Sequence, residues 1–260
     1  MLYYETEFSK LYNGDCIEEM NKLNCKVDKV ITSPPYNIIR PNLDDRGYDE
    51  YNDGMTNEEY LEWIINIFNV YDKILNKNGC ICWNMSYGGE NSNLMSLCIA
   101  DIIRKTNFEL ADVLVWKKTS AIPNNVSSNR CTRIVEFIYI FARKGELGTF
   151  TTNKKIIGNR NSGQAIYQID YNFFEARNND ATTPLNKATF STEFVNELIE
   201  RYVLPTDVVL DNFSGTGTTM FACERRNRKG IYIEISEKQC EYAKNRIGKG
   251  IQTNLFDIME

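Results

Sequence analysis

The chain has no histidine among its 260 residues, so the commonest metal ligand and the commonest general base are both absent. No run of about 18 consecutive apolar residues occurs, and the start Met1-Leu2-Tyr3-Tyr4-Glu5 lacks the basic-then-apolar order of a signal peptide. The eight cysteines show no CxxC spacing, which argues against a zinc site and indicates reduced thiols in the cytosol. We therefore expect a soluble, cytoplasmic protein without a membrane segment or a metal.

Length and charge limit the fold and the partners. A chain of this size buries roughly three quarters of the surface that it exposes when unfolded, so we expect one large domain, or one domain with an inserted lobe. The net charge of −5 argues against a polyanionic partner. However, residues 116–160 carry nine basic side chains against two acidic ones, and Lys117, Lys118, Arg130 and Arg133 are candidate contacts to phosphates. The alternative is a solvated lysine-rich face.

Strand-like and helix-like segments alternate along the chain. Strands are expected at 10–13, 27–32, 80–85, 110–116, 134–142, 207–211 and 230–235, and helices at 16–23, 58–75, 94–105, 192–202, 218–226 and from 236 onward. Gly79 is expected to stop the second helix, and Ser236 with Gln239 predicts a capping box at the start of the last one. The alternation indicates an α/β fold, with a mostly parallel sheet and helices on both faces.

Periodicity fades between Arg143 and Pro184, where the chain is rich in Asn, Thr, Gly and aromatic residues. This length is too great for an ordinary connection. We interpret the segment as a lobe inserted into the sheet domain, which divides the chain into 1–142, 143–184 and 185–260.

A glycine-rich turn, Asp211 to Thr219, follows the strand at 207–211. Gly215 and Gly217 would let backbone amides approach a ligand at the carboxyl edge of the sheet, where open α/β folds bind nucleotides. Glu234 lies about twenty residues further on, at the end of the next strand, and suits the two hydroxyls of a ribose. Met220 replaces the third glycine of a dinucleotide fingerprint, which disfavours a nicotinamide oxidoreductase. The turn favours a nucleoside cofactor, although a strained turn needs glycine even without a ligand.

The earlier motif Thr32-Ser33-Pro34-Pro35-Tyr36-Asn37 follows the strand at 27–32. Its two prolines stiffen the loop and remove two amide donors, which leaves backbone carbonyls to accept hydrogen bonds from an exocyclic amino group. Tyr36 offers a ring on which an extruded base can stack. The alternative is a proline turn with an aromatic side chain packed behind it. Together with a nucleoside site, the motif favours methylation of a nucleobase amino group.

The two motifs resemble those of the DNA amino-methyltransferases that use S-adenosylmethionine. The early motif is similar to their catalytic (D/N/S)PP(Y/F) signature, and 211–219 is similar to their FxGxG cofactor motif. The order, with the catalytic motif first, resembles the β group of that family. Gly14-Asp15 and the segments 185–198 and 227–235 extend the resemblance, which implies a circularly permuted, Rossmann-like methyltransferase fold.

The resemblance also implies residue roles. The catalytic loop would be Ser33, Pro34, Pro35 and Tyr36. The expected cofactor-binding residues are Asp15, Cys16, Thr32, Asp211, Asn212, Phe213, Ser214, Gly215, Gly217, Thr218, Thr219, Glu234 and Ile235, with Asp15 and Cys16 near the adenine and 187–190 near the methionine part. Region 143–184 would recognise the target in double-stranded DNA, from which the base must be flipped out. A homodimer and a cognate restriction endonuclease are partners that the resemblance leaves open.

Ser33 bears on the choice of target base. Cytosine and adenine both present an amino donor beside a ring-nitrogen acceptor, so a serine hydroxyl suits either. In the family that the chain resembles, serine here mostly accompanies N4-methylcytosine and aspartate N6-methyladenine. We predict a site-specific N4-cytosine methyltransferase of a restriction-modification system, with N6-adenine as the alternative. An RNA or protein methyltransferase would not need a long basic insertion, and a non-catalytic DNA-binding module would not need both sites.

Overall fold

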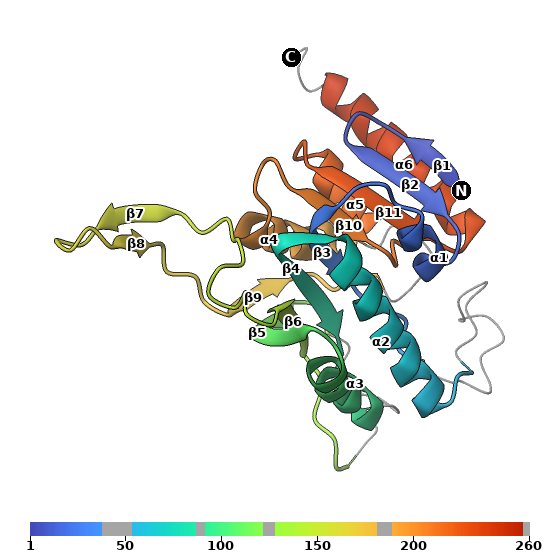
Figure 1. Ribbon diagram of the computed structural model, residues 1–260. Helices are drawn as coiled ribbons and strands as arrows, with labels where there is room; N and C mark the ends of the chain where they lie inside the picture. The colour runs from blue at the N-terminus through green and yellow to red at the C-terminus, as the bar shows by residue number, and fades with distance from the viewer. Residues whose placement is uncertain (38–53, 87–91, 122–127, 181–188, 257–260) are drawn as a thin grey trace.

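The computed structural model describes residues 1–37, 54–86, 92–121, 128–180 and 189–256 (Figure 1). The strands of the central sheet are β1 (Leu2–Glu5), β2 (Ser9–Asn13), β3 (Val27–Thr32), β4 (Leu75–Met85), β5 (Phe108–Lys118), β6 (Val135–Arg143), β9 (Phe173–Ala176), β10 (Val208–Asp211) and β11 (Lys229–Glu234). Within the described residues they form a nine-stranded sheet in the order β1-β2-β11-β10-β3-β4-β6-β5-β9. The predicted α/β architecture is confirmed.

Parallel pairing dominates the centre of this sheet. Strands β2, β11, β10, β3 and β4 pair in parallel with one another in that order, whereas β6 is antiparallel to both β4 and β5. Strand β9, at the edge of the sheet, is parallel to β5. The carboxyl ends of β2, β3, β10 and β11 therefore meet at one edge, which we call the carboxyl edge.

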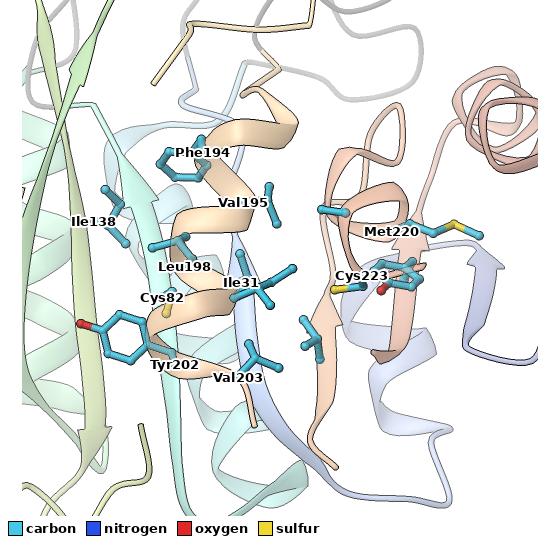
Figure 2. Close-up of a cluster of buried hydrophobic side chains, with 14 of the residues drawn as sticks. Ile31, Cys82, Ile138, Phe194, Val195, Leu198, Tyr202, Val203, Met220 and Cys223 are labelled. Atoms are coloured by element: carbon cyan, nitrogen blue, oxygen red, sulfur yellow. The ribbon is translucent and has the colours of Figure 1, made fainter. Parts of the chain in front are cut away.

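Helices cover both faces of the sheet. Helices α1 (Cys16–Asn21), α2 (Asn57–Ile74) and α3 (Ser92–Lys105) pack on one face, and α4 (Thr192–Tyr202), α5 (Thr218–Glu224) and α6 (Glu237–Phe256) on the other. Neighbouring residues of β3 alternate between the two cores, with Val30 in the first and Ile31 in the second, because successive strand side chains point to opposite faces. Figure 2 shows Ile31 against Leu198 of α4 in the second core.

The predicted helices and strands exist close to their expected bounds, but the expectation for Gly79 is wrong. Helix α2 ends at Ile74 and β4 begins at Leu75, so Gly79 lies inside a strand. A Cβ on Gly79 would lie 2.7 Å from the Asp28 carbonyl oxygen and 2.7 Å from Leu75 Cγ. This glycine is therefore required for close approach of the neighbouring strand, and not for stopping the helix.

The guanidinium of Arg143, at the end of β6, secures the junction of α2 and β4. Its Nε donates to Asp72 Oδ1 at 2.5 Å, Nη2 donates to the carbonyls of Asp72 and Leu75 at 2.7 Å each, and Nη1 donates to the Asn76 carbonyl at 2.9 Å. The orphan carbonyls at the helix C-terminus are thus satisfied by a cation, as the helix dipole favours.

The segment from 143 to 184 divides into two parts, and its last residues, 181–184, lie outside the described chain. Strands β7 (Ile156–Asn159) and β8 (Ala165–Tyr167) form a separate two-stranded sheet, which extends away from the body as an arm (Figure 1). Ile156, Ile157 and Tyr167 on this arm are at least half exposed. Strand β9 instead joins the central sheet beside β5. The periodicity of the sequence did not indicate this short edge strand.

No helix in the described part of the chain combines the length and the apolar character needed to cross a membrane.

Because the Asp28 carbonyl is fixed in the central sheet, Gly79→Ala should force β3 and β4 apart. We expect a loss of about 2 kcal/mol in the free energy of unfolding, as for overpacking elsewhere, measured by equilibrium urea denaturation. Gly148→Ala is the control, since nothing lies within 4 Å of the position of its added Cβ. Equal stabilities of the two variants would contradict this reason for the glycine.

Candidate active site

A cavity of about 220 Å³ opens at the carboxyl edge. Both motifs singled out in the sequence contribute to its wall, although they lie far apart in the chain. The lining residues are Gly14, Asp15, Cys16, Ser33, Pro34, Pro35, Tyr36, Met55, Trp63, Thr189, Phe190, Asn212, Phe213, Ser214, Gly215, Thr218, Glu234, Ile235, Ser236 and Gln239. The parallel topology explains the assembly, because the loops after β2, β3, β10 and β11 all leave the sheet at this edge.

Thr32 and Asp211 join the two motifs beneath the cavity. Thr32 Oγ1 donates to Asp211 Oδ1 at 2.7 Å, and the backbone amide of Phe213 donates to the same oxygen at 3.1 Å. Asp211 is 1% exposed, and this burial raises the pKa of its carboxyl above the ordinary value. The neighbouring Thr219 side chain and these two donors oppose the rise in pKa and partly offset the cost of burying the charge.

Two hydrogen bonds hold the loop after β3 against α2 and the residues before it. Tyr60 donates from its hydroxyl to the Pro35 carbonyl at 2.7 Å, and Asn37 Nδ2 donates to the Met55 carbonyl at 2.8 Å. Asn37 has φ 50°, a left-handed conformation that asparagine tolerates. Ser33 Oγ lies 3.2 Å from Tyr36 Oη. The Pro34 carbonyl accepts no hydrogen bond from the described residues, which leaves it available at the cavity wall.

Glu234 fixes the glycine-rich turn from the opposite side. The Gly215 amide donates to Glu234 Oε2 at 2.7 Å, and the Ser236 amide donates to Oε1 at 2.9 Å. Burial raises the pKa of this carboxyl, and the amide donors oppose the shift. The Gln239 side-chain amide also donates to Oε1, at 3.5 Å. Because a carboxylate can accept about four hydrogen bonds, Glu234 keeps acceptor capacity at Oε2, whose donor is the Gly215 amide. The Gln239 amide donates to Ser236 Oγ at 3.4 Å, which is half of the predicted capping box.

The two glycines of the turn need their conformation for different reasons. Gly215 has φ 52° and lines the cavity. Gly217 has φ 75°, and a Cβ on it would lie 2.6 Å from Ala243 Cβ on α6. Gly217 therefore lets α6 pack against the turn and does not itself line the cavity.

Two polar side chains of the turn carry buried atoms without a hydrogen bond. Asn212 is 1% exposed and Ser214 6%, and neither Asn212 Nδ2 nor Ser214 Oγ has a hydrogen-bond partner within the described chain. Both residues line the cavity. Because unpaired buried polar atoms are rare and costly, these two groups indicate a polar ligand.

The structure brings most of the predicted site residues together. The cavity wall includes all four residues of the predicted catalytic loop and nine predicted cofactor residues, namely Asp15, Cys16, Asn212, Phe213, Ser214, Gly215, Thr218, Glu234 and Ile235. Thr32, Asp211, Gly217 and Thr219 lie behind the wall. Of the segment 187–190, Thr189 and Phe190 line the cavity, whereas Lys187 and Ala188 lie outside the described residues.

Sequence reasoning missed the contribution of α2 and of the residues before it. Trp63 and Met55 line the cavity, and the Trp63 ring lies 5.5 Å from that of Phe213. The helical spacing of apolar residues predicted the helix itself, but a periodic pattern does not tell which of its side chains reaches a site.

The predicted DNA-contacting residues divide into two pairs. Lys117 is ion-paired with Glu175 at 2.8 Å and Lys118 with Glu136 at 2.5 Å. Arg130 and Arg133 are exposed, and no acidic side chain within the described residues pairs with them. Each lysine would have to give up its carboxylate partner to bind a phosphate.

The described residues hold no group of three or more His, Cys, Asp or Glu side chains that could bind a metal ion.

Comparison with known proteins defines the class of this fold and site. The DNA methylase family model N6_N4_Mtase matches residues 27–245. Type II methyltransferase M.HinfI of Haemophilus influenzae is 26% identical over 95% of this chain and 70% of its own length, and M.Cfr9I of Citrobacter freundii is 24% identical over 98% and 92%.

Solved structures share the fold. The PvuII DNA methyltransferase (cytosine-N4-specific) matches with a TM-score of 0.71 and 20% identity over 93% of this chain and 86% of that chain. The M1.HpyAVI-SAM complex matches with a TM-score of 0.61 and 24% identity over 92% and 99%.

The chain therefore belongs to the DNA methylase family of N6/N4 amino-methyltransferases. The family resemblance, the Rossmann-like fold and S-adenosylmethionine as the methyl donor are confirmed.

Thr32→Val tests the junction between the motifs. It removes one donor from a buried carboxylate, so we expect a loss of about 1–3 kcal/mol in the free energy of unfolding near neutral pH. Burial raises the pKa of Asp211 in the folded state, so ionisation of its carboxyl lowers the free energy of unfolding as pH rises above the pKa of the unfolded state. Removing the Thr32 donor makes this loss larger. The deficit should be larger at about pH 7.5 than at about pH 4.

Urea denaturation at both pH values measures this deficit. Thr119→Val is the matched control, because Thr119 is exposed at the end of β5. A deficit independent of pH would show that Thr32 acts without the Asp211 charge.

Proposed function

We propose that the chain methylates the exocyclic N4 of cytosine at a specific site in double-stranded DNA, as a type II modification enzyme with a cognate restriction endonuclease. The observation that carries the proposal is the single cavity bounded by Ser33-Pro34-Pro35-Tyr36 on one side and by the turn 212–215 with Glu234 on the other. A methyl donor and an amino acceptor must meet within bonding distance, and this cavity is open to both motifs.

The wall of the cavity fits S-adenosylmethionine. Asn212 Nδ2 and Ser214 Oγ provide unpaired polar groups, and the remaining acceptor capacity of Glu234 suits ribose hydroxyls. Phe190 and Phe213 provide apolar surface for the uncharged parts. When bound, the cofactor supplies an electrophilic methyl group on a sulfonium.

The catalytic loop would activate the target nitrogen by geometry. The lone pair of an aromatic amine is delocalised into its ring, so the nitrogen is a weak nucleophile until its hydrogens are held out of the ring plane. Ser33 Oγ and the Pro34 carbonyl are the two acceptors for those hydrogens, and Tyr36 supplies the stacking face. Positioning of this kind lowers a barrier by several kcal/mol without a strong base, which is consistent with a chain that lacks histidine.

Ser33 favours cytosine over adenine, on the family tendency that serine here accompanies N4-methylcytosine. The fold similarity to the cytosine-N4-specific PvuII enzyme agrees with this assignment. Adenine N6 is the alternative, because a hydroxyl can accept from either amino group.

The carboxyl edge is also where DNA would approach. Strand β5 ends and β6 begins at this edge, since β6 is antiparallel to both β4 and β5. Their connection, which contains Arg130 and Arg133, therefore leaves the sheet at the same edge as the cavity. The arm follows the end of β6 at the opposite edge, so within region 143–184 we assign target contact to residues 177–180, which follow β9.

Incubation with labelled S-adenosylmethionine and DNA, RNA or protein tests the substrate class. Digestion of methylated DNA to nucleosides, followed by mass spectrometry, then identifies the base. We expect N4-methylcytosine, at a recurring site in host DNA. Recovery of N6-methyladenine would assign the alternative, and label in RNA or protein alone would overturn the proposal.

Single-turnover methylation of one oligonucleotide tests the catalytic loop. Tyr36→Ala should retain S-adenosylmethionine affinity but slow transfer by about tenfold to more than a hundredfold, since base stacking is worth about 1–3 kcal/mol. Tyr36→Phe keeps the ring and is the matched control, so it should retain most of the rate. Ser33→Ala should slow transfer less than Tyr36→Ala, because the Pro34 carbonyl still holds one hydrogen. A wild-type rate for Tyr36→Ala would reduce the motif to a structural turn.

Salt dependence of DNA affinity tests the basic surface. Arg130→Ala with Arg133→Ala should reduce the slope of log affinity against log salt by about 0.9 for each phosphate that is no longer neutralised. Lys117→Ala with Lys118→Ala should reduce it less, because both lysines are ion-paired. Lys26→Ala with Lys229→Ala is the charge-matched control at the opposite edge. An unchanged slope in the arginine variant would show that these arginines do not contact phosphates and that the segment is only a solvated basic face.

A further inference from the structure

Tyr71 belongs to neither motif of the site, yet its hydroxyl contacts the cofactor turn. It lies on α2, is 0% exposed, and donates to Asn212 Oδ1 at 2.5 Å. Its ring is held edge-on by Phe68, at 5.3 Å between ring centroids, and by Trp83, at 6.4 Å. The position of the hydroxyl is therefore fixed by the packing of the core.

The chemistry of the pair sets the orientation of the Asn212 side chain. Burial raises the pKa of Tyr71 well above its ordinary value, so the phenol stays protonated and remains a hydrogen-bond donor. An asparagine amide carries one acceptor oxygen and one donor nitrogen. Because Oδ1 is turned toward Tyr71, Nδ2 must be turned away from it.

Nδ2 is the atom left without a partner. Asn212 lines the cavity, and its Nδ2 has no hydrogen-bond acceptor within the described chain. Burial raises the pKa of the Cys16 thiol to about 12, and its interaction with the Asn212 side chain opposes this rise. Sulfur is only a weak hydrogen-bond acceptor, so Cys16 does not satisfy Nδ2 as an oxygen or nitrogen acceptor would. Ser214, two residues on, places a second unpaired buried hydroxyl at the same cavity. Two such groups on one turn point to a ligand that supplies acceptor atoms, because buried donors are otherwise nearly always paired.

We propose that Tyr71 is a positioning residue for the cofactor: it fixes the Asn212 amide so that Nδ2 donates to an acceptor atom of S-adenosylmethionine. The inference rests on the proposed function, in which this cavity holds the cofactor. Tyr71 does not line the cavity, so it acts only through Asn212. Without its hydroxyl, the amide can rotate and present Oδ1 to the same acceptor, where two acceptors repel.

Calorimetric titration with S-adenosylhomocysteine tests the proposal without turnover. Tyr71→Phe should weaken binding by about fivefold to tenfold, and Asn212→Ala by about tenfold. The double variant should bind within about twofold of Asn212→Ala alone, because residues that act through one contact are not additive. Asn212→Asp keeps the acceptor for Tyr71 but removes the donor, so it should bind no better than Asn212→Ala.

Two further measurements distinguish a positioning role of Tyr71 from an effect on stability and identify which part of the cofactor supplies the acceptor atom. Tyr232→Phe removes another fully buried phenol hydroxyl, on β11 and away from the cavity wall, and should leave the affinity unchanged. Titration with 5′-methylthioadenosine, which lacks the amino-acid part, should show the Tyr71→Phe loss if the acceptor is in the nucleoside. A loss seen only with S-adenosylhomocysteine places the acceptor in the amino-acid part.

Losses that multiply in the double variant, or wild-type affinity of Tyr71→Phe, would overturn the positioning role. Failure of the cavity assignment gives a different result. In that case Glu234→Ala and Asn212→Ala would both bind S-adenosylhomocysteine as tightly as the wild type, whereas under the proposed function Glu234→Ala weakens binding by more than about tenfold.

Discussion

The hydrogen bond between Thr32 and Asp211 holds the two halves of the site in one place. Thr32 is the last residue of β3 and Asp211 the last residue of β10, and these strands are parallel neighbours in the sheet. A carboxylate at this depth is tolerated only with donors around it, and the donors are the residue that precedes Ser33 and the amide of Phe213. The residues nearest the chemistry thus depend on a pair that does not line the cavity.

Helix α2 connects the same two loops from one face of the sheet. Tyr60 bonds the Pro35 carbonyl, Trp63 packs on Phe213, and Tyr71 bonds Asn212. Spacings of three and eight residues keep these side chains on one side of the helix. A single helix therefore contacts both the loop expected to hold the base and the turn expected to hold the cofactor, and two of its contacts are hydrogen bonds from buried tyrosine hydroxyls.

The order of elements could be predicted from the sequence because it depends on local signals, whereas most of the cavity wall was predicted from the resemblance to the DNA amino-methyltransferases. Strands with apolar runs, glycines in the turn and prolines in the loop each indicate their own conformation. The α2 contacts could not be predicted, because no local pattern shows which loop the hydroxyl of Tyr60 or of Tyr71 reaches. The ion pair of Lys117 with Glu175 was equally hidden, since the partners lie on β5 and β9, whose pairing no local pattern indicated.

The direct passage from α2 into β4 makes chain length part of the site's geometry. An α-helix turns by about 100° and advances about 1.5 Å with each residue, and no flexible connection separates Ile74 from Leu75. With Arg143 holding the junction, one residue inserted there would rotate Tyr60, Trp63 and Tyr71 together away from the loops that they support. The length of the chain at this junction is therefore fixed by the site that the helix supports, although no residue of the junction lines the cavity.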